Sequence, residues 1–393
     1  MSRIVRRLPA ALGGLLLLAA TAGAQAPVNP DLSAIGDWRA SSSGQPGRPC
    51  RGRLDLQFHE LELAIGGPLN PYARADFKLS LNEEEGVDIE EAFLVLQRGL
   101  PWGLQLKAGK CLVDLGRSNV QHPHRWLWIE RPLMFQDLFG EEGCKDTGAG
   151  LNSLLPLGSS ALGLSLNLLD QGGLLTEEAL DSPFAPAVVE KAFSGRVSLF
   201  KPLANRLNLD LGLSALRAQV NPVVLTESYE ALPATPGDPL LEDFQPAKRF
   251  GTVAVADLKL KWKRDEYSGL SLVVEALQHR HTVQDLTATA HPDGAVTAVA
   301  VDRALTSHGL FAAAEGRFLK RWDSGLFYDY SQSATAADLQ RHAVGAYAAF
   351  SMAEETLRFS LALRHNVESG AEPWDSATLQ VLFSLGPHKP HEF

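Results

Sequence analysis

Strict two-residue alternation over segments of about ten residues is the feature that most constrains how this chain can fold. In residues 72–81 (YARADFKLSL), Arg74, Asp76, Lys78 and Ser80 alternate with alanine, phenylalanine and leucine. Residues 205–218 and 356–366 repeat the pattern, with leucine or phenylalanine at every second position. Successive side chains of a β-strand point to opposite faces, so each segment predicts a strand with one polar and one apolar face.

The connections between such segments alternate between short and long. We predict sixteen strands, at residues 32–40, 54–65, 72–81, 89–97, 104–111, 147–155, 161–169, 191–200, 207–217, 249–262, 267–277, 308–319, 325–332, 342–351, 356–366 and 376–386. Longer segments rich in proline, glycine and acidic residues lie at 112–146, 170–190, 218–248 and 278–306. This organisation predicts an all-β transmembrane antiparallel barrel with short periplasmic turns and long extracellular loops. A cylinder of about sixteen strands is too wide for its own side chains to fill, so an aqueous lumen is expected.

Aromatic residues provide an independent test of the barrel. Eight of them lie beside the predicted short turns: Tyr72, Trp102, Phe200, Trp262, Tyr267, Phe318, Trp322 and Phe350. Amphipathic rings prefer the boundary between membrane and water, so a barrel explains a ring of aromatics at one end. The alternative is a soluble β-sandwich with core aromatics near its turns, which accounts for fewer of them.

The N-terminal residues predict export. Arg3, Arg6 and Arg7 precede a short apolar run, and Ala24-Gln25-Ala26 fits a cleavage site. Residues 1–26 are therefore expected to be a cleaved signal peptide, and residues 27–393 a single barrel in the cell outer membrane. Removing three arginines changes the net charge from −10 to about −13. An acidic, exported chain without a basic stripe argues against a nucleic-acid partner.

The polar faces of the strands indicate what would line the lumen. The candidate pore-lining residues are Glu60, Glu62, Arg74, Asp76, Lys78, Lys107, Arg196, Asp210, Asp257, Lys259, Lys261, Glu275, Glu315, Arg317, Asp329, Arg358 and Arg364. Acidic and basic side chains nearly balance, so no strong bulk ion selectivity follows, because only charges at a constriction would set it. The alternative is that most of these residues form ion pairs across neighbouring strands.

The long segment at 112–146 is the candidate constriction, since a long loop that folds into a wide barrel narrows it. It contains QHPHRWLWIERP, residues 121–132. His122, His124 and Glu130 are candidate metal ligands because imidazole and carboxylate groups bind divalent cations. The alternative is a packed loop in which the histidines form hydrogen bonds and the tryptophans are anchors.

The sequence says less about disulfide pairing and about catalysis. Cys111 and Cys144 could form a disulfide in an oxidising compartment, and a third cysteine, Cys50, would be left over. The sequence contains neither G-x-S-x-G nor H-E-x-x-H. We therefore predict no catalytic residues and no cofactor.

Several segments together resemble a known family. They are NPDLSAIGDW, NPYARADFKL, IEEAFLVL, LPWGLQLKAGK, GRSNVQHPHRW, ERPLMFQDLFGEEGCKDTGAG and the ending FSLGPHKPHEF. They are similar to Gram-negative outer-membrane proteins related to the phosphate-selective porins, some of which are described as zinc-regulated or receptor-like. The similarity is densest over residues 29–156 and at the C-terminus.

The resemblance implies a porin-like channel for passive diffusion of small solutes or ions. Its surroundings would be outer-membrane lipid and lipopolysaccharide, and the barrel-assembly machinery would insert it. A homotrimer is common for barrels of this size. The alternative function is a metal-responsive or ligand-binding outer-membrane receptor that uses His122 and His124.

Overall fold

The computed structural model describes residues 30–47, 51–82, 86–175, 188–221, 223–225, 248–290, 296–336, 338–352 and 356–386. The predicted signal peptide, residues 1–26, and Cys50 lie outside the described residues. None of the helices in the described part of the chain is long and apolar enough to cross a membrane.

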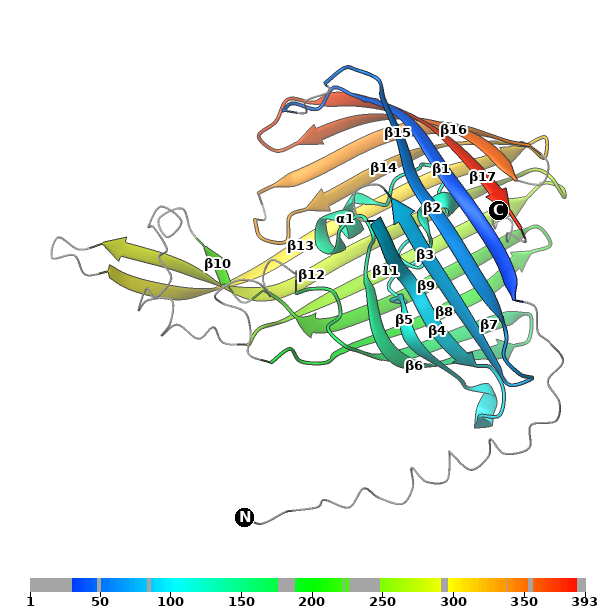
Figure 1. The fold of residues 1–393 in the computed structure, drawn as a ribbon, viewed down its shortest axis with the longest axis horizontal. Helices are drawn as coiled ribbons and strands as arrows, with labels where there is room; N and C mark the ends of the chain where they lie inside the picture. Colours follow the sequence, from blue (N-terminus) through cyan, green and yellow to red (C-terminus); the bar gives the residue numbers. More distant parts are fainter. Residues whose placement is uncertain are drawn as a thin grey trace, which may run out of the picture.

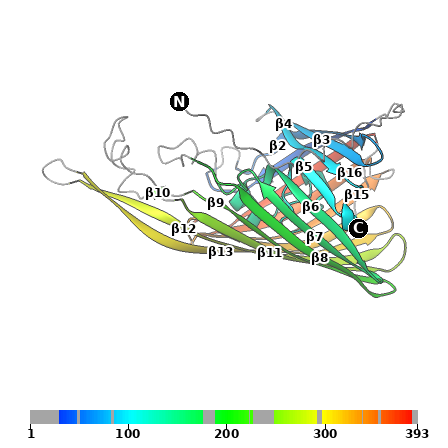
Figure 2. The same ribbon diagram turned by 90° about the horizontal axis from the view of Figure 1, so that it is seen from below.

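Sixteen antiparallel strands close into one barrel, as Figures 1 and 2 show, and a seventeenth short strand lies beside them. The strands are β1 (Asp31–Ser43), β2 (Asp55–Pro68), β3 (Ala73–Asn82), β4 (Gly86–Leu96), β5 (Gln105–Leu112), β6 (Lys145–Leu157), β7 (Ser160–Leu169), β8 (Ala192–Ala204), β9 (Leu207–Gln219), β10 (Val223–Leu225), β11 (Phe250–Lys263), β12 (Gly269–Ala290), β13 (Val296–Phe318), β14 (Trp322–Gln332), β15 (Gln340–Met352), β16 (Leu357–Glu368) and β17 (Trp374–Leu385). A 3₁₀ turn, η2 (Pro101–Gly103), joins β4 to β5. The predicted all-β barrel is confirmed.

Pairing between the first and last long strands closes the cylinder. β1 pairs antiparallel with β17, from Ala34 opposite Leu385 to Ser43 opposite Ser376. On its other side β1 pairs with β2. Closure gives each strand two neighbours, so no edge leaves backbone N–H and C=O groups without partners in hydrocarbon.

Burial along β16 follows the predicted alternation. Leu361 and Leu363 are 46% and 53% exposed, whereas Arg358 and Ser360 are 2% and 1% exposed. The apolar side chains therefore face outward and the polar ones inward, which is the arrangement of a barrel embedded in lipid.

The predicted aromatic ring is also present on the outer surface. Trp102 is 85% exposed, and Tyr72, Trp262, Tyr267 and Trp322 are exposed too, all at or beside short turns. The rings of Trp322 and Phe350 lie 4.8 Å apart across β14 and β15. This belt of aromatic residues marks the membrane boundary at the short-turn end of the barrel.

The hairpin of β12 and β13 is longer than the sequence predicted. A loop was expected over residues 278–306, but the two strands pair from Gly269 opposite Arg317 to Ala290 opposite Val296. Residues 279–290 and 296–306 are rich in threonine, valine and alanine, and each strand supplies the other with backbone partners. At about 3.4 Å per residue the hairpin is far taller than an apolar band of about 25 Å. Figures 1 and 2 show it projecting beyond the barrel, with β10 pairing parallel to it.

The hydrophobic core lies inside the barrel. Residues 113–144, which we name loop 3, connect β5 to β6 and contain the 3₁₀ turn η3 (Pro123–Arg125) and helix α1 (Leu133–Phe139). Figure 1 shows α1 within the cylinder, and it contacts β13 and β14. The loop side chains Leu115, Trp126, Ile129 and Phe135 are almost fully buried. They belong to one cluster with inward-facing wall residues such as Leu216, Val255, Phe311 and Ala349.

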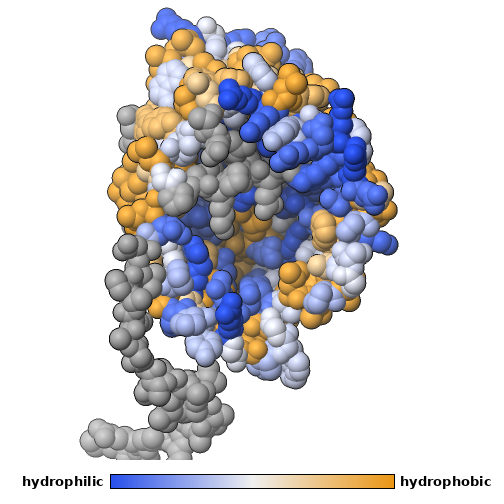
Figure 3. Space-filling model, turned by 90° about the vertical axis from the view of Figure 1, so that its right-hand side faces the viewer, coloured by the Kyte–Doolittle hydropathy of each residue, from blue (hydrophilic) through white to orange (hydrophobic). Residues whose placement is uncertain are grey.

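The barrel remains hollowed at its short-turn end. Figure 3 looks onto that end and shows a recess whose rim is mainly hydrophilic and whose floor includes hydrophobic residues. Loop 3 therefore occupies the middle of the lumen and leaves a vestibule on this side.

Candidate functional site

Loop 3 is fastened to one wall of the barrel by Glu275 on β12. The Glu275 carboxylate accepts hydrogen bonds from the Ser118 backbone N–H at 3.0 and 3.2 Å, from the Arg117 N–H and from the Ser118 hydroxyl. The N–H of Gly116 donates to Ser214 Oγ on β9 at 2.8 Å. Gly116 has a φ of +69°, and an added Cβ would lie 2.7 Å from the Glu275 carboxylate, so glycine is required here.

A second anchor lies on β14 and β16. Arg358 donates to the carbonyl oxygens of His124 at 2.8 Å and Trp126 at 3.3 Å. Arg364 pairs with Glu130 at 2.6 Å and with Asp329 at 3.4 Å. Asp329 accepts from the Leu133 N–H at the first residue of α1. These bonds satisfy backbone groups of the loop that are buried inside the barrel.

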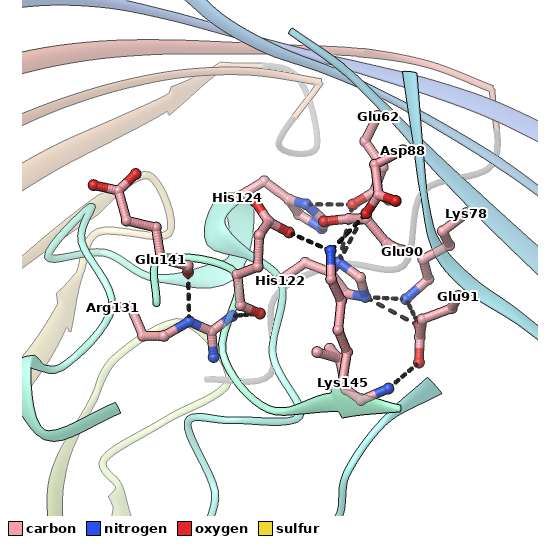
Figure 4. A network of polar contacts seen from close by, with 12 residues as sticks. Glu62, Lys78, Asp88, Glu90, Glu91, His122, His124, Arg131, Glu141 and Lys145 are labelled. Atoms are coloured by element: carbon pink, nitrogen blue, oxygen red, sulfur yellow. Dashed lines mark hydrogen bonds and ion pairs between the residues drawn. The ribbon is translucent and has the colours of Figure 1, made fainter. Parts of the chain in front are cut away.

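The third contact region joins loop 3 to β2 and β4 and contains both predicted histidines. Figure 4 shows Glu62, Glu90 and Glu91 projecting toward His122 and His124. Nδ1 of His122 lies 3.3 Å from Glu62 Oε2 and 3.1 Å from Glu90 Oε2. Nδ1 of His124 lies 3.2 Å from the same Glu62 oxygen. Glu62, Glu90, Glu91 and His122 are all buried, with at most 6% of each residue exposed.

A β-bulge explains why two consecutive glutamates face the lumen. On β3, Lys78 pairs with Glu91 and Leu79 pairs with Ile89, so Glu90 is an extra residue on β4. A bulge places two residues opposite one and redirects a side chain. Strict alternation would have turned either Glu90 or Glu91 toward lipid.

The other edge of His122 is also occupied. Its Nε2 lies 3.1 Å from Glu91 Oε2 and 2.5 Å from Lys78 Nζ, and Lys78 pairs with Glu91 at 2.6 Å. Burial alone would lower the pKa of His122, but the interactions with Glu90 and Glu91 outweigh it and raise that pKa to about 9. Burial lowers the pKa of His124, and Glu62 only partly opposes this effect. The pocket therefore favours a positive charge beside its carboxylates.

Sixteen of the seventeen predicted pore-lining residues fall into two groups. Nine of them contact loop 3 or its ion-pair partners: Glu62, Lys78, Arg196, Asp210, Asp257, Glu275, Asp329, Arg358 and Arg364. Seven others lie in the strand portions next to the short turns: Arg74, Asp76, Lys107, Lys259, Lys261, Glu315 and Arg317. Glu60 lies part-way along β2 and is half-buried. That these residues line a pore stays a prediction, and the sequence pattern did not indicate their contacts with the loop.

Some residues of the second group pair within the wall. Arg74 pairs with Asp76 at 2.7 Å, and Arg317 pairs with Asp323 at 2.8 Å. Lys107 Nζ lies 4.0 Å from the ring centroid of Phe93. Such ion pairing within the wall is the alternative to pore lining that was raised in the sequence analysis.

A small cavity lies between loop 3 and the short-turn end. It has a volume of about 60 Å³ and is lined by Arg117, Gln121, Arg125, Lys259, Glu315 and Arg317, together with four smaller or apolar neighbours. Four of these side chains are basic and one is acidic. Arg117 and Arg125 come from loop 3 and were missed from the sequence, because nothing in a loop's pattern indicates which residues face a cavity.

Two sequence predictions need correction. Glu130 does not join the histidines, because its carboxylate pairs with Arg364. Glu62 and Glu90 lie beside the histidines instead.

The predicted disulfide is also absent, because Cys111 and Cys144 are both free. Cys111 pairs in register with Asp146, and Cys144 lies opposite Val113, two residues along the ladder. Diagonal strand neighbours of this kind have Cα atoms about 7–8 Å apart, which exceeds the reach of a disulfide.

Comparison with known proteins places the fold among outer-membrane channels. The chain matches no family model. It is 27% identical over 276 residues to an uncharacterized protein of Aquifex aeolicus, and the match covers 68% of this chain and 53% of that protein. The chain therefore spans about half the length of this curated relative.

Solved structures share the barrel. An anion-selective porin from Comamonas acidovorans superimposes with a TM-score of 0.56 at 10% identity, covering 91% of this chain and 99% of that one. The outer-membrane channel DcaP of Acinetobacter baumannii gives 0.52 at 10% identity, covering 91% and 97%. OmpT of Vibrio cholerae, in a trimer form, gives 0.51 at 8% identity, covering 91% and 100%. These similarities concern the fold of outer-membrane porins in general. The finer resemblance to phosphate-selective or zinc-regulated members stays a prediction.

Proposed function

We propose that this protein is an outer-membrane, porin-like channel for passive diffusion of small solutes or ions. The observation that carries the proposal is a closed barrel with an apolar exterior, in which loop 3 lies inside the lumen beside a cavity whose charged lining residues are mostly basic. Among its structural neighbours, one is described as an anion-selective porin and another as an outer-membrane channel.

The passage would run from the long-loop end past loop 3 into the vestibule at the short-turn end. Loop 3 packs a buried apolar cluster against the wall, so the route would be limited to the polar side of the loop. Arg125 and Lys259 would face a passing solute beside the Glu315 carboxylate. Arg117 and Arg317 also line the cavity, but they pair with Asp210 and Asp323. Charges at a constriction set selectivity, so a preference for small anions follows.

Export and assembly belong to the same proposal. The predicted signal peptide would direct the chain across the inner membrane, and the barrel-assembly machinery would insert it among outer-membrane lipid and lipopolysaccharide. A homotrimer is compatible with the trimer form of the Vibrio cholerae neighbour. No catalytic step is proposed.

Liposome swelling tests the function. The mature chain, refolded into liposomes, should admit small anions and small neutral solutes but exclude disaccharides, because only a narrow route remains beside loop 3. The mature chain heat-denatured before reconstitution is the control. A folded barrel that admits none of these solutes would contradict a diffusion channel.

A metal-responsive receptor is the second candidate, and the convergence of Glu62, Glu90 and His122 favours it. A receptor would change its surface or its conductance when a cation binds. Conductance that responds saturably to a metal would support this function over a simple porin.

A further inference from the structure

The contact region of loop 3 with β2 and β4 contains a set of metal-ligand atoms. One ligand atom each from Glu62, Glu90 and His122 lie within 4.8 Å of one another, and all three residues are buried. His124 lies outside this group of three but offers a further nitrogen, 3.2 Å from the Glu62 oxygen that also faces His122. The two imidazole rings are nearly parallel, with centroids 5.8 Å apart.

Three of the donor separations are close to the edge length of a metal tetrahedron. Zn²⁺ bonds of about 2.0–2.1 Å place neighbouring tetrahedral donors about 3.3–3.4 Å apart. The three measured donor separations, from His122 to Glu62, from His122 to Glu90 and from His124 to Glu62, are 3.3, 3.1 and 3.2 Å. Glu62, Glu90 and His122 are therefore grouped closely enough for one ion, and His124 would have to move toward it to complete a tetrahedron.

Two of the donor oxygens have no hydrogen-bond partner. Glu62 Oε2 and Glu90 Oε2 are both inaccessible to solvent and accept no hydrogen bond from the described residues. Each of them lies 3.1–3.3 Å from a histidine nitrogen. A buried carboxylate oxygen without a partner is costly, so a cation in contact with both oxygens would stabilise the site.

The negative charge of the pocket also favours binding of a cation. Glu62, Glu90 and Glu91 carry three formal negative charges, and Lys78 supplies one positive charge among them. A divalent cation that displaces the proton from Nδ1 of His122 would balance the remaining two. Magnesium and calcium prefer oxygen ligands alone, whereas two imidazoles with two carboxylates suit zinc or a similar first-row transition metal.

An outer layer of contacts is already present around His122. Its Nε2 lies 3.1 Å from Glu91 Oε2 and 2.5 Å from Lys78 Nζ, and Nδ1 is directed at Glu62 and Glu90. A carboxylate on the far nitrogen fixes the tautomer and orientation of a metal-binding histidine. The bulge at Glu90 provides one ligand and one outer-layer carboxylate from consecutive residues.

We propose that Glu62, Glu90, His122 and His124 bind one divalent transition-metal ion, with zinc the best match, and that this ion fastens loop 3 to the barrel wall. Two ligands come from the wall and two from the loop. The site does not depend on transport, so it could be present in a channel or in a receptor.

Metal binding to the refolded mature protein tests the proposal. After removal of metal with a chelator, titration with Zn²⁺ alone should give one equivalent bound per chain, measured by calorimetry and by elemental analysis. Glu62→Gln, Glu90→Gln and His122→Ala should each remove this stoichiometric binding. Glu91→Gln, which changes the outer layer, should weaken it by about 10–100-fold.

His279 and His281 provide the matched control. They form a second H-x-H pair, stacked with centroids 4.2 Å apart, and no carboxylate is paired with them in the described part of the chain. The variant His279→Ala/His281→Ala should keep full zinc binding. Heat-modifiable gel mobility would establish that each variant is folded.

A spectroscopic readout separates a built site from loss of folding. Co²⁺ bound to the wild-type protein should give the visible absorption of tetrahedral coordination, absent in folded His122→Ala protein. Folded wild-type protein that binds no zinc, or zinc binding lost equally in the His279 and His281 control, would overturn the proposal.

Discussion

Glu275 on β12 accepts two backbone hydrogen bonds from Ser118 on loop 3, at 3.0 and 3.2 Å. This contact spans 157 residues of sequence and holds the loop across the lumen. We expect Glu275→Leu to release that side of the loop, because the N–H groups of Arg117 and Ser118 lose their buried acceptor. The released loop should be cut by trypsin at Arg117 or Arg125 in reconstituted protein.

Asp323→Asn is the control for this change. Asp323 is also a buried wall carboxylate, but its partner Arg317 belongs to the wall. It should leave loop 3 resistant to trypsin. Equal resistance of Glu275→Leu and wild-type protein would show that Glu275 does not hold the loop.

Arg358 should contribute measurably to stability. Replacing it with methionine removes the donor for the buried carbonyl oxygens of His124 and Trp126. We expect the free energy of unfolding to fall by about 1–3 kcal/mol, the usual cost of leaving buried polar groups without partners. Urea unfolding in liposomes measures it, and an unchanged midpoint would contradict the assigned contact.

Arg125 should influence ion selectivity. Arg125→Glu reverses a charge in the cavity between loop 3 and the short-turn end. The ratio of anion to cation permeability, obtained from reversal potentials in a salt gradient, should decrease. Arg264→Glu, at an exposed short turn, is the matched control and should change the ratio little. A ratio equally altered by both variants would argue against the cavity as the selective point.

The two described cysteines should behave as thiols. Peptides containing Cys111 and Cys144 should be alkylated in unfolded protein without any reductant. In folded protein Cys144 should resist alkylation, because it is buried and burial raises its thiol pKa well above the usual range. Peptide mapping by mass spectrometry measures both states. Alkylation that requires prior reduction would indicate a disulfide instead.

The strands were predictable from the sequence because one face of each contacts lipid and the other contacts the lumen. That requirement imposes the alternation seen at Leu361, Leu363, Arg358 and Ser360. The requirement does not apply where the hairpin of β12 and β13 projects beyond the membrane, since neither face of a strand there must be apolar. The segment 278–306 therefore carried no lipid-facing signature.

The candidate site was only partly predictable. The pair His122 and His124 could be found from its spacing, but their carboxylate partners come from β2 and β4, far away in sequence. Glu90 faces inward because of a bulge, which alternation cannot predict. The pairing of Glu130 with Arg364 depends on how loop 3 crosses the lumen, and the sequence alone does not specify that path.

Single-channel recording tests the central claim most directly. The refolded mature protein in a planar bilayer should give small, stepwise conductance with a preference for anions, and Glu275→Leu should increase the conductance or its fluctuations because loop 3 narrows the lumen. Folded wild-type protein that inserts but conducts no ions, with Glu275→Leu equally silent, would contradict the account of this barrel as a channel narrowed by loop 3.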